Sequence, residues 1–572
     1  MLVTQRRCLI VCLIALLLSS CAQPRSPATA TPRSTAIAAP SIPATASPTA
    51  RPAVTPPRPF PGGLVANWWD DAVFYVLLVR SFYDSDGDGY GDLQGLIDKL
   101  DYLNDGDPTT DSDLGVNALW LMPVYASPTY HGYAASDYHH IEPHYGDNET
   151  FRRFVDQAHQ RSIHVIVDLA LNHTSEKHPW FLESISSPDA PRRDWYVWLD
   201  ADPGWRGPDL RAVWFLRNGA YYYAFFGSAL PDLNLRNESV TAQMLDVARF
   251  WLLDMGVDGF RLDAVRHLIE EGEDQESTPA TLQWLKHFRD SHQSLVPHAM
   301  TVGEVTGPTA ERLPYYDGQV DLCFEFDWAA AAVESLNKGD PAPLLATQSL
   351  ISSVYPRGQY AVFLALQDQN RIISQLRDSP PKARLAATLL LTSPGVPFLY
   401  YGEEIGMRGA KPDVFIRRPM QWSDELRAGF STGRPWMDVD LNYDVVNVQT
   451  ESSDPDSLLS HYRRLMRLRL QFSALRTGDW IPLGASNAQV YAFLRHADDA
   501  GLMVVLNLAD EPLQQVQFSV SQSPLQAGDY QPTELLSQED ITPIRVNIEG
   551  GFQDYVPLDA LAPLSGYVIQ IR

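Results

Sequence analysis

Short apolar runs alternate with segments of helical period through most of the sequence, from Trp68 onward. Runs of this length are typical of buried parallel strands, and the segments between them, with apolar residues at spacings of three and four, are typical of covering helices. Eight runs qualify as strands, at residues 72–79, 118–122, 164–171, 257–263, 299–305, 322–328, 360–366 and 396–402. The pattern predicts an α/β fold, and eight such units are the number that closes a TIM (β/α)8 barrel.

Two intervals depart from this alternation. Residues 174–238 run through Trp-, Tyr- and Pro-rich sequence without a clear helix, which predicts a subdomain inserted after the third strand. Beyond a helical run at about 457–472, residues 476–572 contain strand-like pieces without helices between them, which predicts a C-terminal antiparallel β-sandwich domain. Because 572 residues exceed what one hydrophobic core usually serves, we expect a catalytic barrel domain at 67–475 and a separate β domain after it.

The N-terminus has the features of an export signal. Two arginines precede an apolar run at 8–18 that is too short to span a bilayer as a permanent helix, so residues 1–21 are predicted to be a signal peptide. The run ends in Leu-Ser-Ser-Cys21, which resembles the bacterial lipoprotein cleavage box; an ordinary signal peptide cut nearby is the alternative. Residues 22–66, rich in Pro, Ala, Thr and Ser, cannot bury enough apolar surface to fold and are predicted to be a disordered linker.

These features set expectations about location and partners. We expect an extracytoplasmic monomer, at the cell surface or secreted, that touches a membrane only through its lipid anchor. A lipidated Cys21 leaves Cys323 without an intramolecular disulfide partner, so packing and bound ions must supply the stability. The formal net charge of −26 argues against nucleic acid and other polyanionic partners, whereas a neutral substrate is easier to accommodate.

Three carboxylates lie where active residues of barrels lie, at the carboxyl ends of strands. Asp263 closes the run at 257–263, Glu304 follows a glycine in the run at 299–305, and Asp368 lies just past the run at 360–366. Any one of them alone could be a loop-capping acid, but three at equivalent strand ends indicate a catalytic site. Arg261 lies two residues before Asp263, so strand alternation points both side chains to the same face.

Six short segments carry a recognisable pattern: DLALNH (168–173), DGFRLDAVRH (258–267), GEV (303–305), FLALQD (363–368), LPDLN (230–234) and HGY (131–133). In this order and at these strand ends they resemble the signatures of the α-amylase superfamily, glycoside hydrolase family 13. The resemblance covers nearly everything from Trp68 to the C-terminus. It implies a retaining glycoside hydrolase acting on an α-glucan, built on a TIM barrel with an inserted subdomain.

By that resemblance Asp263 is the nucleophile, Glu304 is the general acid and base, and Asp368 grips the sugar hydroxyls and favours the transition state. A retaining glycosidase needs one ionised and one protonated carboxyl about 5 Å apart. We expect crowding by the other acids to raise the pKa of Glu304. We also expect Arg261 to hold Asp263 in its ionised form. The substrate-binding residues that the resemblance implies are Tyr133, stacked on the sugar, His173, bonded to its hydroxyls, and Arg266 and His267 on the leaving-group side. Tyr133 could otherwise be a core tyrosine, and Arg266 and His267 could lie on the surface of the next helix.

The fourth signature departs from the family pattern, which reads His-Asp where this chain has Gln367-Asp368. A glutamine can donate a hydrogen bond to a sugar hydroxyl, but it cannot carry positive charge. We therefore expect an active enzyme with a modified sugar subsite at Gln367, where some electrostatic stabilisation of the transition state is missing.

An Asp/Gly-rich segment at 84–92 spaces oxygen ligands by two residues, as calcium loops do, although the bidentate glutamate of an EF-hand is absent. A plain Asp/Gly turn is the alternative. The resemblance implies a structural Ca2+ bound by the carboxylates of Asp84, Asp86, Asp88 and Asp92 and by the carbonyl of Tyr90. It also implies a second Ca2+ site at Asn172 and Asp232, which would pin the inserted subdomain to the barrel.

The residue after the nucleophile resembles a linkage marker of the superfamily, in which Ala or Thr tends to accompany α-1,4 action and Val α-1,6 action. Here it is Ala264, so we favour an α-amylase that acts on starch or maltodextrins. The signatures leave open an exo-acting α-glucosidase or oligo-1,6-glucosidase, and a transglycosylase of the trehalose synthase type. A non-catalytic glucan-binding lipoprotein is a further alternative, against which the joint presence of the three acids and Arg261 argues, because buried like charges are costly to keep without a task.

Overall fold

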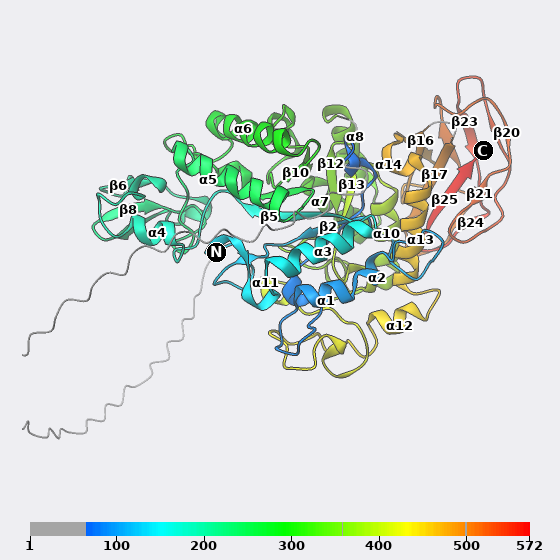
Figure 1. Ribbon diagram of the computed structural model, residues 1–572. Coiled ribbons are helices and arrows are strands. Elements are labelled where there is room, and N and C mark those ends of the chain that lie inside the picture. The colour runs from blue at the N-terminus through cyan, green and yellow to red at the C-terminus, as the bar shows by residue number, and fades with distance from the viewer. Residues whose placement is uncertain (1–63, 357, 498–499) are drawn as a thin grey trace, which may run out of the picture. The chain divides into compact units, whose positions relative to one another are not determined.

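The structure is a computed structural model that describes residues 64–356, 358–497 and 500–572 (Figure 1). The predicted signal peptide at 1–21, with Cys21, and residues 22–63 of the predicted linker lie outside the described residues. None of the helices in the described ranges combines the length and the apolar character that a membrane span requires.

Eight parallel strands close into a barrel, which confirms the predicted (β/α)8 architecture. Each of the eight predicted runs contains one barrel strand. Barrel strands that are consecutive in the sequence are neighbours in the barrel, and the last strand, β13, pairs with the first, β1. Side chains on both faces are buried and mostly apolar, as is usual for parallel strands with both faces covered. The barrel strands are β1 Phe74–Leu77, β2 Ala118–Leu121, β5 His164–Ala170, β9 Gly259–Asp263, β10 Met300–Gly303, β11 Leu322–Phe324, β12 Tyr360–Phe363 and β13 Val396–Tyr400.

Several predicted runs extend beyond their strands, and the run at 322–328 crosses into a helix. The run at 322–328 was expected to be a strand throughout, but β11 ends at Phe324 and α7 begins at Phe326. Trp328 is fully buried on α7 and donates its indole N–H to Gln348 of α8 at 3.0 Å. A short apolar stretch that crosses from a buried strand into a buried helical turn keeps the same composition, so the pattern could not mark the boundary.

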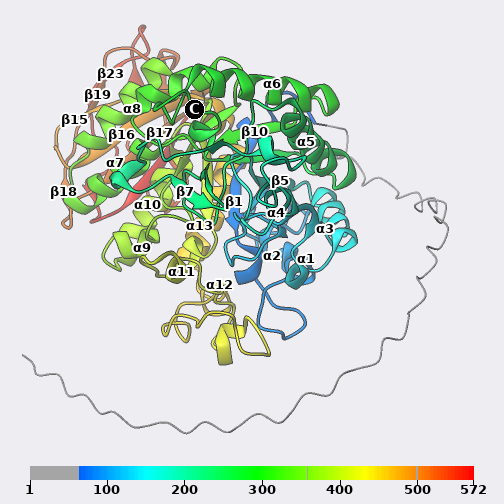
Figure 2. The ribbon, with the colours of Figure 1, turned by 90° about the vertical axis from the view of Figure 1, so that its left-hand side faces the viewer.

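Helices surround the barrel strands (Figure 2). The longer ones are α3 Asn148–Gln160, α5 Glu238–Arg249, α6 Pro279–Leu295, α7 Phe326–Lys338, α8 Ala342–Val354, α10 Pro380–Thr392 and α13 Leu458–Gln471. Shorter ones are α1 Leu93–Asp98, α2 Leu100–Leu103, α9 Ile372–Gln375, α11 Asp413–Ile416, α12 Val448–Ser452 and α14 Ser473–Thr477. Side-chain caps set several first turns; Asp147, for example, accepts the N–H of Thr150 at 2.8 Å and so starts α3.

The interval at 174–238 holds one short α-helix, two 3-10 turns and a three-stranded antiparallel sheet in the order β6, β8, β7. Their bounds are α4 Pro179–Ser184, β6 Trp198–Leu199, β7 Trp214–Arg217 and β8 Ala220–Tyr223. Helix α4 contradicts the expectation of an interval without a helix. Six residues are too few to produce a helical period, and the start of α4 is set locally by His178, whose side chain accepts the N–H of Trp180 at 3.1 Å.

A two-stranded antiparallel pair precedes the third barrel strand. It consists of β3 Tyr125–Ala126 and β4 Asp137–Ile141. The connection between these strands carries the segment that contains Tyr130, His131 and Tyr133, and the pairing presents this connection beside the carboxyl ends of the barrel strands.

The C-terminal part is an antiparallel β domain, as predicted. One sheet has the order β14 Asp479–Pro482, β16 Val490–Ala497, β17 Ala500–Asn507, β25 Gly566–Ile571 and β21 Thr533–Glu534. A second has the order β15 Gly484–Ala485, β19 Phe518–Val520 and β23 Phe552–Tyr555. Two further pairs are β18 Leu513–Gln514 with β24 Ala560–Leu561, and β20 Gly528–Tyr530 with β22 Ile544–Val546. Side chains from both larger sheets, such as Met503, Phe518 and Ile569, share one apolar core.

Two buried glutamates follow β13. Glu403 accepts a hydrogen bond from the Tyr462 hydroxyl at 2.8 Å, and Glu404 accepts from the hydroxyls of Tyr75 and Tyr102 at 2.7 Å each. Burial raises the pKa of Glu403 to about 8, and the neighbouring Glu404 adds to the rise. Glu403 is therefore mostly protonated in the folded protein at neutral pH.

The glutamate at 403 should weaken the fold at alkaline pH. Its pKa is about 8 in the folded state, whereas the ordinary pKa of a glutamate is 4.5, so its stabilising contribution is complete below the lower pKa and is lost as pH rises through the higher one. Glu403→Gln keeps an acceptor for Tyr462 but cannot ionise. Calorimetry should find that the Tm of the variant, relative to that of the parent, is higher at about pH 9 than at about pH 5. A Tm difference that does not change with pH would contradict the assignment.

Candidate active site

A cavity of about 320 Å3 opens at the carboxyl ends of the barrel strands. Asp263 is the last residue of β9, Glu304 follows the last residue of β10, and Asp368 lies beyond the end of β12. The structure brings these three carboxylates from distant parts of the chain to the wall of this one cavity. The other lining residues are Tyr130, His131, Tyr133, His173, Phe226, Leu230, Ala264, Asp413 and Arg417.

One guanidinium group holds the acids of the site together. Arg261 Nη1 lies 2.5 Å from Asp263 Oδ1, and its Nη2 lies 2.9 Å from Glu304 Oε2. The Arg261 side chain is buried, so solvent screens these ion pairs little. Asp263 and Glu304 therefore share one guanidinium group. Two acids paired with one guanidinium group match the closely spaced carboxyl pair of retaining glycosidases and not the gap of roughly 6.5–9.5 Å that inverting enzymes keep for a water molecule.

The environment favours a proton on Glu304. Burial raises the pKa of Glu304 and the nearby Asp263 raises it further, whereas Arg261 and the N–H of Ala264, 3.2 Å from Oε2, lower it. Burial also raises the pKa of Asp263, against a direct ion pair with Arg261. The direction for Glu304 is the one expected from the sequence, but the largest cause is burial and not crowding by the other acids. A close pair of this kind holds one shared proton more readily than two separate charges.

Asp168 is a site residue that the sequence analysis did not assign. It lies inside β5, opposite Arg261 in the sheet register, and its Oδ1 is 2.9 Å from Arg261 Nη1. It also accepts hydrogen bonds from the Tyr133 hydroxyl at 2.9 Å and from the indole N–H of Trp120 at 3.3 Å. Burial raises the pKa of Asp168 to about 7, although Arg261 opposes the rise. An acid in the middle of an apolar strand was the available signal, because such a group stays buried only with a partner.

Gln367 lies behind the cavity wall, beside Tyr133. Its Nε2 donates to the Tyr133 hydroxyl at 3.3 Å, and its Oε1 has no hydrogen-bond partner in the described part of the chain. Gln367 is 2% exposed and is absent from the cavity lining. The structure therefore places Tyr133 on the cavity and Gln367 as a neighbour that supports it.

The predicted histidines occupy different positions. His173 lines the cavity, and burial lowers its pKa to about 4, so the ring is neutral near pH 7. Its Nε2 is without a partner among the described residues. His267 is not on the lining: its ring stacks on Phe225 with a centroid distance of 3.9 Å, and its Nδ1 lies 3.1 Å from the carbonyl oxygen of Gln275. Arg266 is likewise absent from the lining.

Asp368 is paired with Arg417, which does not lie at the end of a barrel strand. Arg417 Nη2 lies 2.6 Å from Asp368 Oδ1, and Arg417 Nε donates to the carbonyl oxygen of Gln367 at 3.2 Å. Burial raises the pKa of Asp368, and Arg417 opposes the rise. Asp413, whose carboxylate is 3.6 Å from Arg417, also faces the cavity. Asp413 begins the short helix α11 and Arg417 directly follows it, at a place where neither strand pattern nor signature pointed to them.

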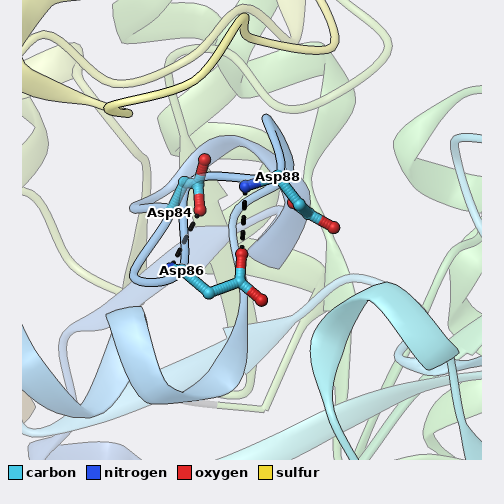
Figure 3. A group of neighbouring side chains, drawn as sticks. All are labelled: Asp84, Asp86 and Asp88. Carbon is cyan, nitrogen blue, oxygen red and sulfur yellow. Dashed lines mark hydrogen bonds between the residues drawn. The ribbon is translucent and has the colours of Figure 1, made fainter.

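Three aspartates gather on the tight loop between β1 and α1 (Figure 3). One carboxylate oxygen from each of Asp84, Asp86 and Asp88 lies within 4.8 Å of the other two, and such an oxygen set suits Ca2+. Asp92 was predicted to belong to this set but is not part of the group. Its carboxylate accepts the N–H of Gly95 at 2.7 Å and so caps α1. The ring of Tyr90 packs under the guanidinium carbon of Arg80, at 4.6 Å from the ring centroid.

Asn172 and Asp232 meet where the interval at 174–238 joins the barrel. Burial raises the pKa of Asp232 well above its usual value, and the neighbouring Asn172 opposes the rise. Asn172 Oδ1 and Asp232 Oδ2 are buried and lack a hydrogen-bond partner among the described residues. Two uncompensated buried oxygens of this kind fit a cation, which would satisfy both.

The comparisons with known proteins agree on one family. The family described as "Alpha amylase, catalytic domain" matches residues 76–478. Alpha-amylase 3 of Dictyoglomus thermophilum is 37% identical over 445 residues, which are 77% of this chain and 85% of that protein. The trehalose synthase/amylase TreS of Mycolicibacterium smegmatis is 35% identical over 491 residues, 75% of this chain and 80% of that protein. The crystal structure of an alpha-amylase from H. orenii has a TM-score of 0.77 at 38% identity and covers 88% of this chain and 99% of that one.

Removal of the Arg261 guanidinium group should destabilise the fold. Arg261→Met would leave buried carboxylates unpaired, which typically costs about 3–5 kcal/mol of unfolding free energy. The loss should be largest near neutral pH and shrink as the acids become protonated at lower pH. Denaturant unfolding measures it. Arg545→Met is the control, because the Arg545 side chain is 87% exposed and should change stability by less than about 0.5 kcal/mol. Equal losses in the two variants would contradict the central role of Arg261.

Proposed function

Since the chain belongs to the alpha-amylase family of glycoside hydrolases, we propose that it cleaves α-1,4-glucosidic bonds of starch or maltodextrins with Asp263, Glu304 and Asp368. The observation that carries this proposal is the contact of one buried guanidinium, that of Arg261, with both Asp263 and Glu304 beside an open cavity. The close spacing of these two acids supports a retaining reaction.

The reaction would take two steps. Asp263 attacks the anomeric carbon while Glu304 gives its proton to the leaving glycosidic oxygen, so the bond to Asp263 forms as the glycosidic bond breaks. Glu304, now ionised, then takes a proton from water, whose oxygen attacks the anomeric carbon and releases Asp263. Two inversions at this carbon leave its configuration unchanged. Arg261 stabilises the Asp263 carboxylate before the attack and after the release.

Sugar binding would use the remaining wall of the cavity. Asp368, oriented by Arg417, would accept hydrogen bonds from sugar hydroxyls and favour the positively charged transition state. The Tyr133 ring would stack on the sugar, and the free Nε2 of the neutral His173 would bond a hydroxyl. Arg266 and His267 lie off the cavity lining, so any contact they make would be with a part of the substrate beyond this cavity.

A transglycosylase is the second candidate function. The relative named trehalose synthase/amylase supports it, since a sugar in place of water can resolve the same glycosyl-enzyme. Chromatography of products from maltoheptaose separates the candidates, because hydrolysis yields shorter maltooligosaccharides and transfer yields longer or isomeric ones. Incubation of the same substrate with a blocked non-reducing end separates endo from exo action. A non-catalytic glucan-binding role is disfavoured by the acid pair on Arg261.

We also propose that Asp84, Asp86 and Asp88 hold a structural Ca2+, and that Asn172 and Asp232 contribute to a second site. The convergence of three carboxylate oxygens supports the first site, and the two uncompensated buried oxygens support the second. A bound Ca2+ would neutralise the repulsion among the aspartates and fix the loop that carries them. At the second site it would tie the interval at 174–238 to the barrel.

Export and anchoring rest on the sequence of residues 1–21 alone. We propose that Cys21 carries lipid, so that a monomer acts outside the cytoplasm, at the cell surface or after secretion, on neutral α-glucans.

Loss of the proton on Glu304 should abolish most turnover. Glu304→Gln cannot donate a proton, and the loss of a general acid typically lowers kcat/KM by about 10²–10⁴-fold. Reducing-sugar release from maltoheptaose measures the effect, and NMR of the first product reads its anomeric configuration. Glu334→Gln, on the exposed face of α7, is the matched control. Full activity of Glu304→Gln would sink the assigned role of this residue.

Chelation should lower the melting temperature. A ligand that binds only the folded state stabilises it by mass action, so dialysis against EDTA should reduce Tm and added Ca2+ should restore it. Asp86→Asn should reduce the response to Ca2+, because Asp86 contributes an exposed carboxylate to the cluster. A Tm that chelation leaves unchanged would refute the structural calcium.

A further inference from the structure

The loop that carries the three aspartates packs against a segment that is distant from it in the sequence. We call residues 84–92 the aspartate loop and residues 430–436 the strap. The N–H of Asp84 donates to the carbonyl of Phe430 at 3.1 Å, the Ser431 hydroxyl donates to Asp84 Oδ2 at 2.5 Å, and the N–H of Trp436 donates to the carbonyl of Gly89 at 2.8 Å. The backbones touch so closely that a Cβ on Gly89 would lie 2.0 Å from the carbonyl oxygen of Arg434. The strap therefore cannot move independently of the aspartate loop.

Trp436, at the end of the strap, is fixed from three sides. Its indole N–H donates to the Ser81 hydroxyl at 3.2 Å, and the guanidinium carbon of Arg80 lies 5.7 Å from its ring centroid. Arg80 also sits over the ring of Tyr90, which belongs to the aspartate loop. The third side is a stack on Tyr130, with a centroid distance of 5.4 Å and an interplanar angle of 26°. Trp436 thus joins the aspartate loop to a residue of the cavity wall.

Tyr130 in turn contacts Arg417, the residue that is paired with Asp368. Arg417 Nη1 donates to the Tyr130 hydroxyl at 3.4 Å, and the Arg417 guanidinium carbon lies 5.6 Å from the Tyr130 ring centroid. The same guanidinium bonds Asp368 through Nη2 at 2.6 Å. Arg417 is 3% exposed and tightly packed, so a displacement of Tyr130 would be transmitted to its guanidinium group.

We propose that Trp436 and Tyr130 are positioning residues that hold Arg417 on Asp368, and that through them a divalent cation on the aspartate loop and a sugar in the cavity strengthen each other's binding. The inference rests on the proposed hydrolase and its calcium site. Without a cation, the carboxylates of Asp84, Asp86 and Asp88 repel one another, which loosens the surface on which the strap packs. A cation removes that repulsion, and a sugar that bonds Asp368 favours the same arrangement from the other end. Two ligands that favour one arrangement of a shared element are coupled, and the coupling is reciprocal.

The test is a binding cycle on the full chain in the cleavage-blocked Glu304→Gln background. Isothermal titration measures the Kd of Ca2+ with and without saturating maltotetraose, and then the Kd of maltotetraose with and without Ca2+. We expect each ligand to tighten the other by the same factor, of the order of 5-fold or more. Trp436→Ala should bring this factor close to one, while Trp436→Phe, which keeps a ring on Tyr130, should retain most of it. Tyr130→Phe, which removes only the hydroxyl that faces Arg417, should give an intermediate factor.

The control is Trp480→Ala in the C-terminal domain, which should leave the factor unchanged. Independent binding of the two ligands in the Glu304→Gln background would overturn the inference and leave the hydrolase and its calcium site standing. Absence of Ca2+ binding would overturn both the inference and the calcium proposal, while hydrolysis by the parent would still stand. If Trp436→Ala does not fold, an undiminished factor in Tyr130→Phe would overturn the route through Tyr130.

Discussion

The active site depends on the placement of one cation inside the barrel. Three carboxylates would repel each other in this buried setting, and the guanidinium of Arg261 is the group that allows Asp168, Asp263 and Glu304 to lie together. Asp168 fixes the arginine from a neighbouring strand, so its planar fork is aimed at the other two acids before any substrate arrives. The chemistry follows from this arrangement, because a retaining glycosidase needs two close acids that do not both lose their protons.

A second arginine, Arg417, lines the cavity and is paired with Asp368. Arg417 orients Asp368 and is reached, through Tyr130 and Trp436, from the aspartate loop. The proposed nucleophile Asp263 and the proposed proton donor Glu304 lie at the ends of barrel strands, whereas Tyr130 and Arg417 lie on connections between elements. This division explains how a rigid barrel can keep one chemistry while the loops adjust the substrate.

The strand ends could be predicted from the sequence, and the irregular segments could not. Asp263, Glu304 and Asp368 follow apolar runs, and barrel closure turns positions at equivalent strand ends into neighbours in space. Arg417 has no such local mark, since its position depends on the tertiary packing of the segment after β13. Asp92 fits the spacing of a calcium ligand, but a helix begins directly after it and takes its carboxylate as a cap. Gln367 was expected on the sugar; its buried side chain bonds the Tyr133 hydroxyl and is absent from the cavity lining, a placement that the signature could not indicate.

We propose that Asp263 forms a covalent bond to the sugar while Glu304 transfers the proton. The most direct measurement is mass spectrometry of the protein after incubation with 5-fluoro-α-glucosyl fluoride, a substrate whose second step is slow. We expect a mass increase of one fluoroglucosyl group, located after digestion on the peptide that contains Asp263. Steady turnover with no adduct, or with the label on any other residue, would contradict it.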